Sequence, residues 1–226
     1  MTGAAAEQRC PGVPLRHPGP RHAERIVSVP TDVTVVRTQL PRGERIADAL
    51  WRLTSESGAT AASVELAHGS FGILRYVYPA IGTDRPAYFS ETVEPAGPCF
   101  VRTGSATVGV RDGAGFAHIH ATWFDEHGRV RGGHLLPDTT VGDIPIEATV
   151  RLLSDVDLVS ATDPETDMPV FTPHPRRTPG RARAVMSRIR PGEDLCGAVA
   201  TIARRAGFAS ATVRASVGSL VAPACA

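Results

Sequence analysis

The sequence has few cysteines, no long hydrophobic run and almost no net charge, and each scarcity argues against a class of protein. Its four cysteines are far apart and include no Cys-x-x-Cys pair. This spacing argues against a zinc ribbon and a disulfide scaffold, and it fits a reducing cytoplasm. No apolar run is long enough to span a bilayer. The formal net charge of +1 gives no global attraction to nucleic acid or membranes.

What remains is the composition of an ordinary soluble globular protein, with 42% hydrophobic and 21% charged residues among 226. We expect residues 1–28 to form a disordered tail, because they lack the apolar segment of a signal peptide. The main domain is predicted over residues 29–173, a Pro- and Arg-rich linker over 174–184, and a last unit over 185–226. Linker-like composition, rich in Pro, Thr and Arg, already begins near residue 160.

The main domain has the pattern of many strands and one helix. The apolar spacing of Ile46, Ala49, Leu50 and Leu53 predicts a helix that Gly58 ends. One helix among hairpin-connected strands predicts an α+β domain, in which an antiparallel-rich sheet packs against the helix. β-Branched and alternating segments predict strands over 33–40, 61–67, 73–78, 87–93, 99–110, the histidine segment that follows, and 144–153.

Two histidines lie on one face of a predicted strand, and a third follows a double glycine. His118 and His120 point to the same side of the strand, because successive side chains alternate. Residues 125–128 predict a turn, and Gly132-Gly133 would let the return strand bend, so that His134 approaches the pair. Three imidazoles with an open fourth position are typical of a catalytic zinc site. Alternatively, the histidines are hydrogen-bonded surface groups.

The C-terminal segment repeats the beginning of the main domain. Pairing Gly43 with Gly192 gives an offset of 149 residues, at which the apolar helix positions coincide and Gly58 meets Gly207. We interpret this match as a partial β-α-β repeat, with a strand, a helix and a second strand. Such a fragment cannot bury its apolar faces alone. It must dock on the main domain, be completed by another subunit, or remain loose.

One basic cluster interrupts the balanced charge. Because no aromatic residues are interleaved with it and no Arg-Gly-Arg-Pro core of an AT-hook is present, we interpret it as a solvated linker. The alternative is an arm that binds the phosphates of DNA. The cluster comprises Arg176, Arg177, Arg181 and Arg183, followed by Arg188 and Arg190.

The order of these motifs resembles the plants-and-prokaryotes-conserved (PPC) domain. The resemblance is carried by Leu40-Pro-Arg-Gly-Glu44 before the helix, Gly69-Ser70 after the next strand, the three histidines with their double glycine, and the closing segment 163–171. It covers residues 33–173 and, for the repeat, residues 185–221. It implies an α/β sandwich-like domain that assembles as a homotrimer. It also implies, for some members, an association with DNA.

The His-x-His…Gly-Gly-His segment is also similar to the zinc-binding segment of acetolactate decarboxylase. That similarity implies zinc ligation by His118, His120 and His134 and chemistry on a small oxo- or hydroxy-acid. It supplies no match for that enzyme's acidic and arginine residues. Glu65 and His68, near the end of the second predicted strand, are the only additional site candidates.

Three functions therefore compete at this point. The first is a cytoplasmic, oligomeric, zinc-binding PPC-type protein, which as an enzyme would act on a small oxo- or hydroxy-acid through Lewis-acid catalysis or an activated water. The second is a DNA-binding regulator that uses the arginine cluster. The third is a structural oligomer in which the histidines line a subunit interface without chemistry.

Overall fold

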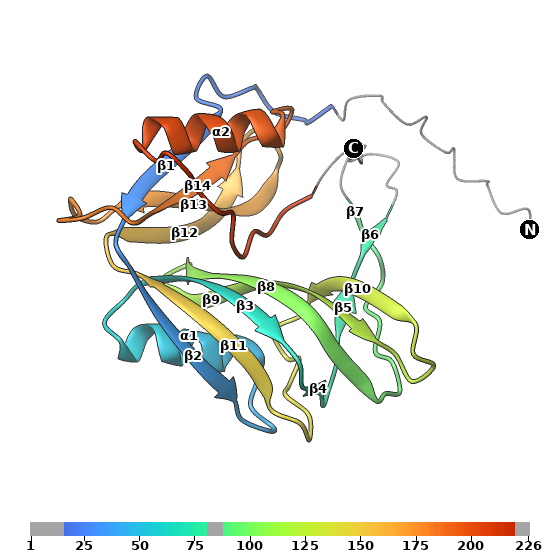
Figure 1. Ribbon diagram of the computed structural model, residues 1–226. Helices are drawn as coiled ribbons and strands as arrows, with labels where there is room; N and C mark the ends of the chain where they lie inside the picture. The colour runs from blue at the N-terminus through green and yellow to red at the C-terminus, as the bar shows by residue number, and fades with distance from the viewer. Residues whose placement is uncertain (1–15, 81–87, 220–226) are drawn as a thin grey trace, which may run out of the picture.

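The computed structural model describes residues 16–80 and 88–219. Its centre is an antiparallel sheet in the order β2-β11-β3-β8-β9-β10-β5, with one helix against one face (Figure 1). This arrangement confirms the predicted α+β class. The strands of this path are β2 (Val33–Leu40), β11 (Ile146–Leu153), β3 (Ala61–Ala67), β8 (Cys99–Arg111), β9 (Ala114–Phe124), β10 (Val130–Leu135) and β5 (Tyr76–Val77).

Helix α1 (Ile46–Glu56) packs on this sheet through the residues whose spacing predicted it. Ile46, Ala49 and Leu50 are fully buried, and burying each of the two larger side chains contributes about 1.5–3 kcal/mol. The helix ends before Gly58, whose φ of +76° lies in the left-handed region that glycine adopts most easily. The sheet residues that face α1 include Val64 and Ile119, so the opposite face is left for polar side chains.

A second, smaller layer lies beyond the opposite face of the sheet (Figure 1). Val156, Leu158 and Val29 form its core, together with Ala61 and Leu153 from the main sheet. Gly109 permits close contact between the layers, because a Cβ there would lie 2.2 Å from the carbonyl oxygen of Leu158. The layer consists of the hairpin β12 (Val156–Asp163) and β13 (Met168–Pro175), the antiparallel pair β1 (Ile26–Thr31) and β14 (Ala184–Ile189), and α2 (Leu195–Arg205).

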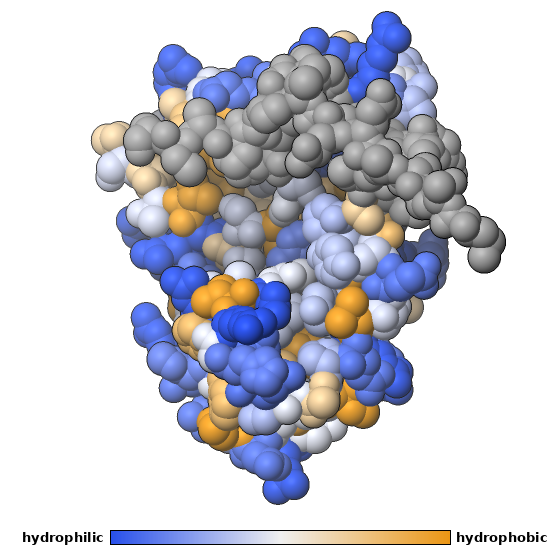
Figure 2. All heavy atoms as spheres, turned by 90° about the vertical axis from the view of Figure 1, so that its right-hand side faces the viewer, coloured by the Kyte–Doolittle hydropathy of each residue, from blue (hydrophilic) through white to orange (hydrophobic). Residues whose placement is uncertain are grey.

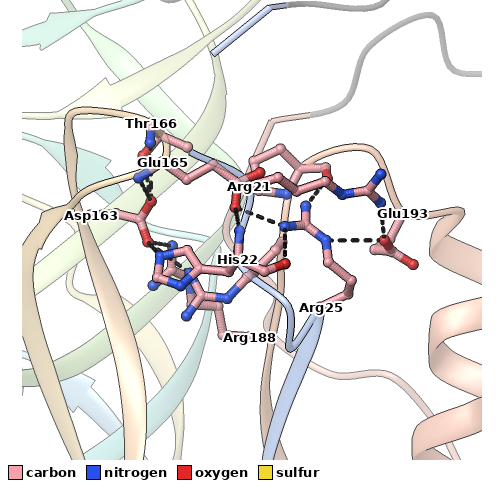
Figure 3. A network of polar contacts seen from close by, with 10 residues as sticks. Arg21, His22, Arg25, Asp163, Glu165, Thr166, Arg188 and Glu193 are labelled. Atoms are coloured by element: carbon pink, nitrogen blue, oxygen red, sulfur yellow. Dashed lines mark hydrogen bonds and ion pairs between the residues drawn. The ribbon is translucent and has the colours of Figure 1, made fainter. Parts of the chain in front are cut away.

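Polar contacts around Asp163 connect the parts of this second layer (Figure 3). The Asp163 carboxylate is 1% exposed and accepts hydrogen bonds from the guanidinium groups of Arg188 and Arg190 on and after β14. Arg25, just before β1, donates to Glu165 at 2.7 Å and to Glu193 at 3.2 Å. These ion pairs join the β12–β13 hairpin, the β1–β14 pair and the start of α2.

Several sequence predictions differ from the structure in this layer. The tail predicted to end at residue 28 gives way to β1 at Ile26, where Arg25 just before the strand is paired with the buried carboxylate of Glu165. The linker-like segment from residue 160 contains β12 and β13, since Asp163 and Glu165 find cationic partners that composition alone does not reveal. Only residues 176–183 connect β13 to β14. The expected order of strand and helix follows in β14 and α2, but residues 208–219 form no second strand.

Smaller differences concern the region before β8. The strand predicted over 73–78 is reduced to the short β5, and residue 87 of the predicted strand 87–93 lies outside the described residues. A register shift between Val101 and Thr103 interrupts the pairing of β8 with β9. The remaining short strands are β4 (Ser70–Phe71), β6 (Pro79–Ala80) and β7 (Tyr88–Phe89).

Neither α1 nor α2, the helices of the described residues, is long and apolar enough to cross a bilayer. Figure 2 shows the side of the molecule that lies at the right of Figure 1, where hydrophobic residues form separate patches among hydrophilic ones.

Candidate metal centre

The three predicted histidines meet on the sheet face opposite α1. His118 and His120 lie on β9, and His134 lies on β10 directly opposite His120. Their ring centroids are 4.7–5.4 Å apart. Among the residues that the structure describes, they are the only group of three or more His, Cys, Asp or Glu side chains close enough to hold a metal ion. The predicted convergence of the three imidazoles is thus confirmed.

The double glycine allows His134 to reach this position. A Cβ at Gly133 would lie 2.6 Å from the Tyr76 ring and 2.8 Å from the carbonyl oxygen of Val77, so a side chain there would displace β5. Gly132 is less restricted, since its Cβ would approach Thr122 Cγ2 at 3.3 Å. Only the second glycine is therefore needed for the close approach of β5 to β10, which pairs Val77 with His134.

The donor set suits a divalent transition metal. Zinc–nitrogen bonds of about 2.0–2.1 Å at tetrahedral angles separate ligand nitrogens by about 3.4 Å. The Nε2 atoms of His118 and His120 are 3.0 Å apart, and the candidate ligand atoms of all three residues lie within 4.8 Å of one another. Small side-chain rotations suffice to bring the nitrogens to coordinating distances, so the residues fit a bound metal.

Burial and mutual repulsion keep these imidazoles neutral, the protonation state that binds metal. Burial, followed by the neighbouring His134 and His120 and by Arg111, lowers the pKa of His118 to about 3. Burial, His120 and Arg111 lower the pKa of His134 to about 4. Burial also lowers the pKa of His120. The site thus has three deprotonated nitrogen donors at neutral pH.

The histidines are the end of a polar row that crosses the sheet. Strand register places His134, His120, Ser105, Glu65, Thr149 and Arg37 side by side on successive strands. Glu65 is two strands from His120, roughly 10 Å by backbone spacing. Its carboxylate accepts a hydrogen bond from Arg151 at 2.9 Å and lies 3.9 Å from Arg214.

The other sequence candidates lie elsewhere. His68 is exposed at the turn after β3, where it has a φ of +51°, and it is not part of the histidine group. Three members of the basic cluster make local contacts: Arg177 binds Asp155 at 2.6 Å and Arg183 binds Asp32 at 2.5 Å, while Arg176 donates to Thr60 at 3.5 Å. Arg181 is exposed.

Two arginines on the histidine face were not predicted. Arg111, at the end of β8, and Arg151, on β11, share this face by strand register. Alternation within each strand could have assigned them to a face. The sequence could not show that β8 and β11 lie in the same sheet as the histidine hairpin, because strand order depends on long-range pairing.

The fold and the site together define a class of protein. It is an α+β domain that carries three convergent histidines on the sheet face opposite its helix. The chain belongs to the Plants and Prokaryotes Conserved (PCC) domain family, the domain abbreviated PPC above, whose family model matches residues 28–153. That match ends before β12, whereas we predicted a domain extending to residue 173. No curated protein matches the chain.

Solved structures share this fold at low sequence identity. A metal-containing protein from Archaeoglobus fulgidus is 22% identical with a TM-score of 0.51, over 64% of this chain and 95% of that one. A hypothetical protein from Salmonella is 17% identical with a TM-score of 0.52, over 65% and 97%. A Ralstonia eutropha JMP134 protein, provisionally described as DNA-binding, is 23% identical with a TM-score of 0.49, over 66% and 95%.

Proposed function

We propose that this protein is a zinc-binding PPC-type protein that acts on a small oxo- or hydroxy-acid. The observation that supports the proposal most directly is the convergence of His118, His120 and His134 within metal-ligand distances. The metal-containing protein from Archaeoglobus fulgidus, which has a similar fold, adds support for metal binding. The similarity of the histidine segment to acetolactate decarboxylase supports the class of substrate.

A bound zinc ion would supply a Lewis acid that polarises a carbonyl or hydroxyl oxygen. The residues of the chain would hold the ion and transfer protons. The three imidazoles would hold the ion on the sheet face, and Glu65, in the same polar row, is the candidate carboxylate for handling a proton. Arg151 would position that carboxylate through its 2.9 Å hydrogen bond.

Metal analysis of the purified protein tests the proposal. We expect about one zinc ion per chain in the wild type and at most a tenth of that in His120→Ala, because two imidazoles rarely hold zinc against dialysis. His127→Ala is the matched control, since His127 is an exposed histidine in the turn after β9. Zinc-free wild type, or full zinc content in His120→Ala, would refute the site.

The DNA-binding alternative has less support. Arg177 and Arg183 are engaged with Asp155 and Asp32, so their charges are partly neutralised within the chain. The net charge of +1 adds no general attraction. Affinity for duplex DNA that falls steeply with salt, and falls further in Arg177→Gln and Arg181→Gln, would favour this alternative over the metal-dependent function.

We also propose that the protein is cytoplasmic and self-associates as a homotrimer, as the resemblance to the PPC domain implied. Strand β2 lies at one end of the sheet path, and its Val35 and Val36 are 48% and 37% exposed. An unpaired edge with exposed apolar side chains favours pairing between chains. Light scattering should give three times the chain mass of 23.8 kDa. Intact assembly after metal removal, with no ligand bound, would support the purely structural alternative.

A further inference from the structure

Arg111 is held rigidly on the face that carries the histidines. Its guanidinium carbon lies 3.7 Å from the centroid of the Phe116 ring, and its Nε donates a hydrogen bond to Ser160 Oγ at 3.1 Å. The ring below and the hydroxyl at one edge fix the plane of the guanidinium. The two terminal nitrogens remain as a fork of donors, the arrangement that binds carboxylates in two parallel hydrogen bonds.

This arginine differs from others in the same part of the molecule. Arg151, Arg177 and Arg188 each contact a carboxylate. Within residues 16–80 and 88–219, no carboxylate lies within ion-pair distance of Arg111. Burying a cation without a nearby negative charge destabilises the folded protein. A ligand that supplies the negative charge would therefore bind to Arg111 favourably.

The arginine is close enough to act together with a metal on the histidines. Phe116 and His118 are alternate residues of β9 on the same face, which separates them by roughly 7 Å. The guanidinium lies over Phe116, so it is one such step from the histidine group. Its charge acts on the group, since Arg111 is among the causes that lower the pKa of His118 and His134.

We propose that Arg111 binds the anionic end of a small acid whose other end supplies oxygen ligands to the metal on His118, His120 and His134. The spacing favours a compact dicarboxylate, in which a 2-hydroxy- or 2-oxo-acid head is followed by a second carboxylate a few atoms away. This inference rests on the proposed metal site and adds the residue that selects the ligand.

Calorimetric titration of the zinc-loaded protein with malate and with lactate tests this assignment. Both probes carry a 2-hydroxycarboxylate head, but only malate has a second carboxylate. Wild type should bind malate about tenfold more tightly than lactate, equivalent to about 1.4 kcal/mol. Arg111→Gln should remove most of this preference and leave the affinity for lactate within about twofold. Arg111→Lys, which keeps the charge but loses the fork, should retain part of it.

Arg37→Gln is the matched control. Arg37 is an exposed arginine on the same sheet face but on β2, four strands from β9, so its removal should leave the preference unchanged. Zinc content and thermal unfolding are measured for every variant. Zinc-loaded wild type that binds malate no better than lactate, or equal preference in wild type and Arg111→Gln, would overturn the role of Arg111 alone. Zinc-free wild type would refute the metal site and this inference with it.

Discussion

Replacing Asp163 by asparagine tests whether buried ion pairs hold the parts of the second layer together. The Asp163 side chain is 1% exposed, and those of Arg188 and Arg190 are 11% and 10% exposed. The backbone N–H groups of Glu165 and Thr166 also donate to Asp163 Oδ1 at 2.9 and 3.0 Å. Asparagine keeps an oxygen for the backbone donors but leaves two guanidinium groups without a counter-charge.

The expected loss of stability is large. Breaking a buried ion pair by neutralising one partner costs about 3–5 kcal/mol, because the remaining charge stays buried without compensation. An independent estimate comes from the carboxyl group itself. Burial would raise the pKa of Asp163, but the hydrogen bonds and charges of Arg188 and Arg190 and the N–H of Thr166 outweigh it, and the pKa falls to about 2. Compared with the ordinary value of 3.8, this corresponds to about 2 kcal/mol.

The same carboxyl group gives an acid dependence with a defined sign. The unfolded chain takes up a proton at Asp163 near pH 3.8, whereas the folded chain does so only near pH 2. Its contribution to stability is therefore fully present above about pH 4 and is lost as the pH falls towards 2. Asp163→Asn should lack this part of the acid dependence.

Urea unfolding with hydrogen exchange resolved by segment measures both effects. We expect a loss of about 3 kcal/mol at pH 7, with protection lost first in β1 and β14 and retained longer in β3, β8 and β9. Asp143→Asn is the control, because Asp143 and its partner Arg42 are 81% and 74% exposed and such surface pairs contribute about 0–1 kcal/mol. A loss below 1 kcal/mol in Asp163→Asn, or equal loss of protection in all strands, would refute the reasoning.

Three further predictions concern the site and the core. Gly133→Ala should displace β5 from β10 and lower the zinc content, whereas Gly132→Ala should retain the zinc. The reason is that only a Cβ at Gly133 would lie less than 3.0 Å from backbone and ring atoms. Metal analysis measures the zinc content, and equal content in both variants would contradict this prediction. Trp123→Ala should destabilise the protein by about 3–5 kcal/mol, since this ring is 1% exposed and packs edge-on against Phe71 and Tyr76. Thermal unfolding measures the loss of stability, and a loss under 1 kcal/mol would contradict that packing. Gly109→Ala should lower the stability of the contact between β8 and β12 by about 1–3 kcal/mol, because the added methyl group overpacks it. Hydrogen exchange in β12 should become faster, and unchanged exchange there would contradict the contact between the layers.

The sequence predicted local features better than long-range ones. The strand at 61–67 followed from its apolar residues Val64 and Leu66, and the helix that ends before Gly58 followed from helical spacing; both signals depend on neighbouring residues alone. The three-histidine group was also predictable, because two members share one strand and the third lies across a single hairpin. The hairpin β12–β13 was not, since its stability comes from Asp163 and Glu165 and their distant partners.

Site residues outside the hairpin were hidden for the same reason. Glu65 was named as a candidate only for its place near the end of the second predicted strand, whereas Arg111 was missed. Its position beside the histidines depends on the pairing of β8 with β9 and on the hydrogen bond to Ser160 of β12. Neither contact leaves a periodic signal in the sequence, because both join residues that are apart along the chain.

The two helices differ in how much of their apolar surface they bury. Helices α1 and α2 have the same length of 11 residues and aligned apolar positions, but α1 buries four residues and α2 buries only Ala198. The difference arises because α1 covers a broad sheet, whereas α2 has only the pair β1–β14 beneath it and residues 208–219 add no strand. Leu195 is consequently 44% exposed. Ion pairs such as Arg25 with Glu193 therefore take over part of the role that apolar packing has under α1.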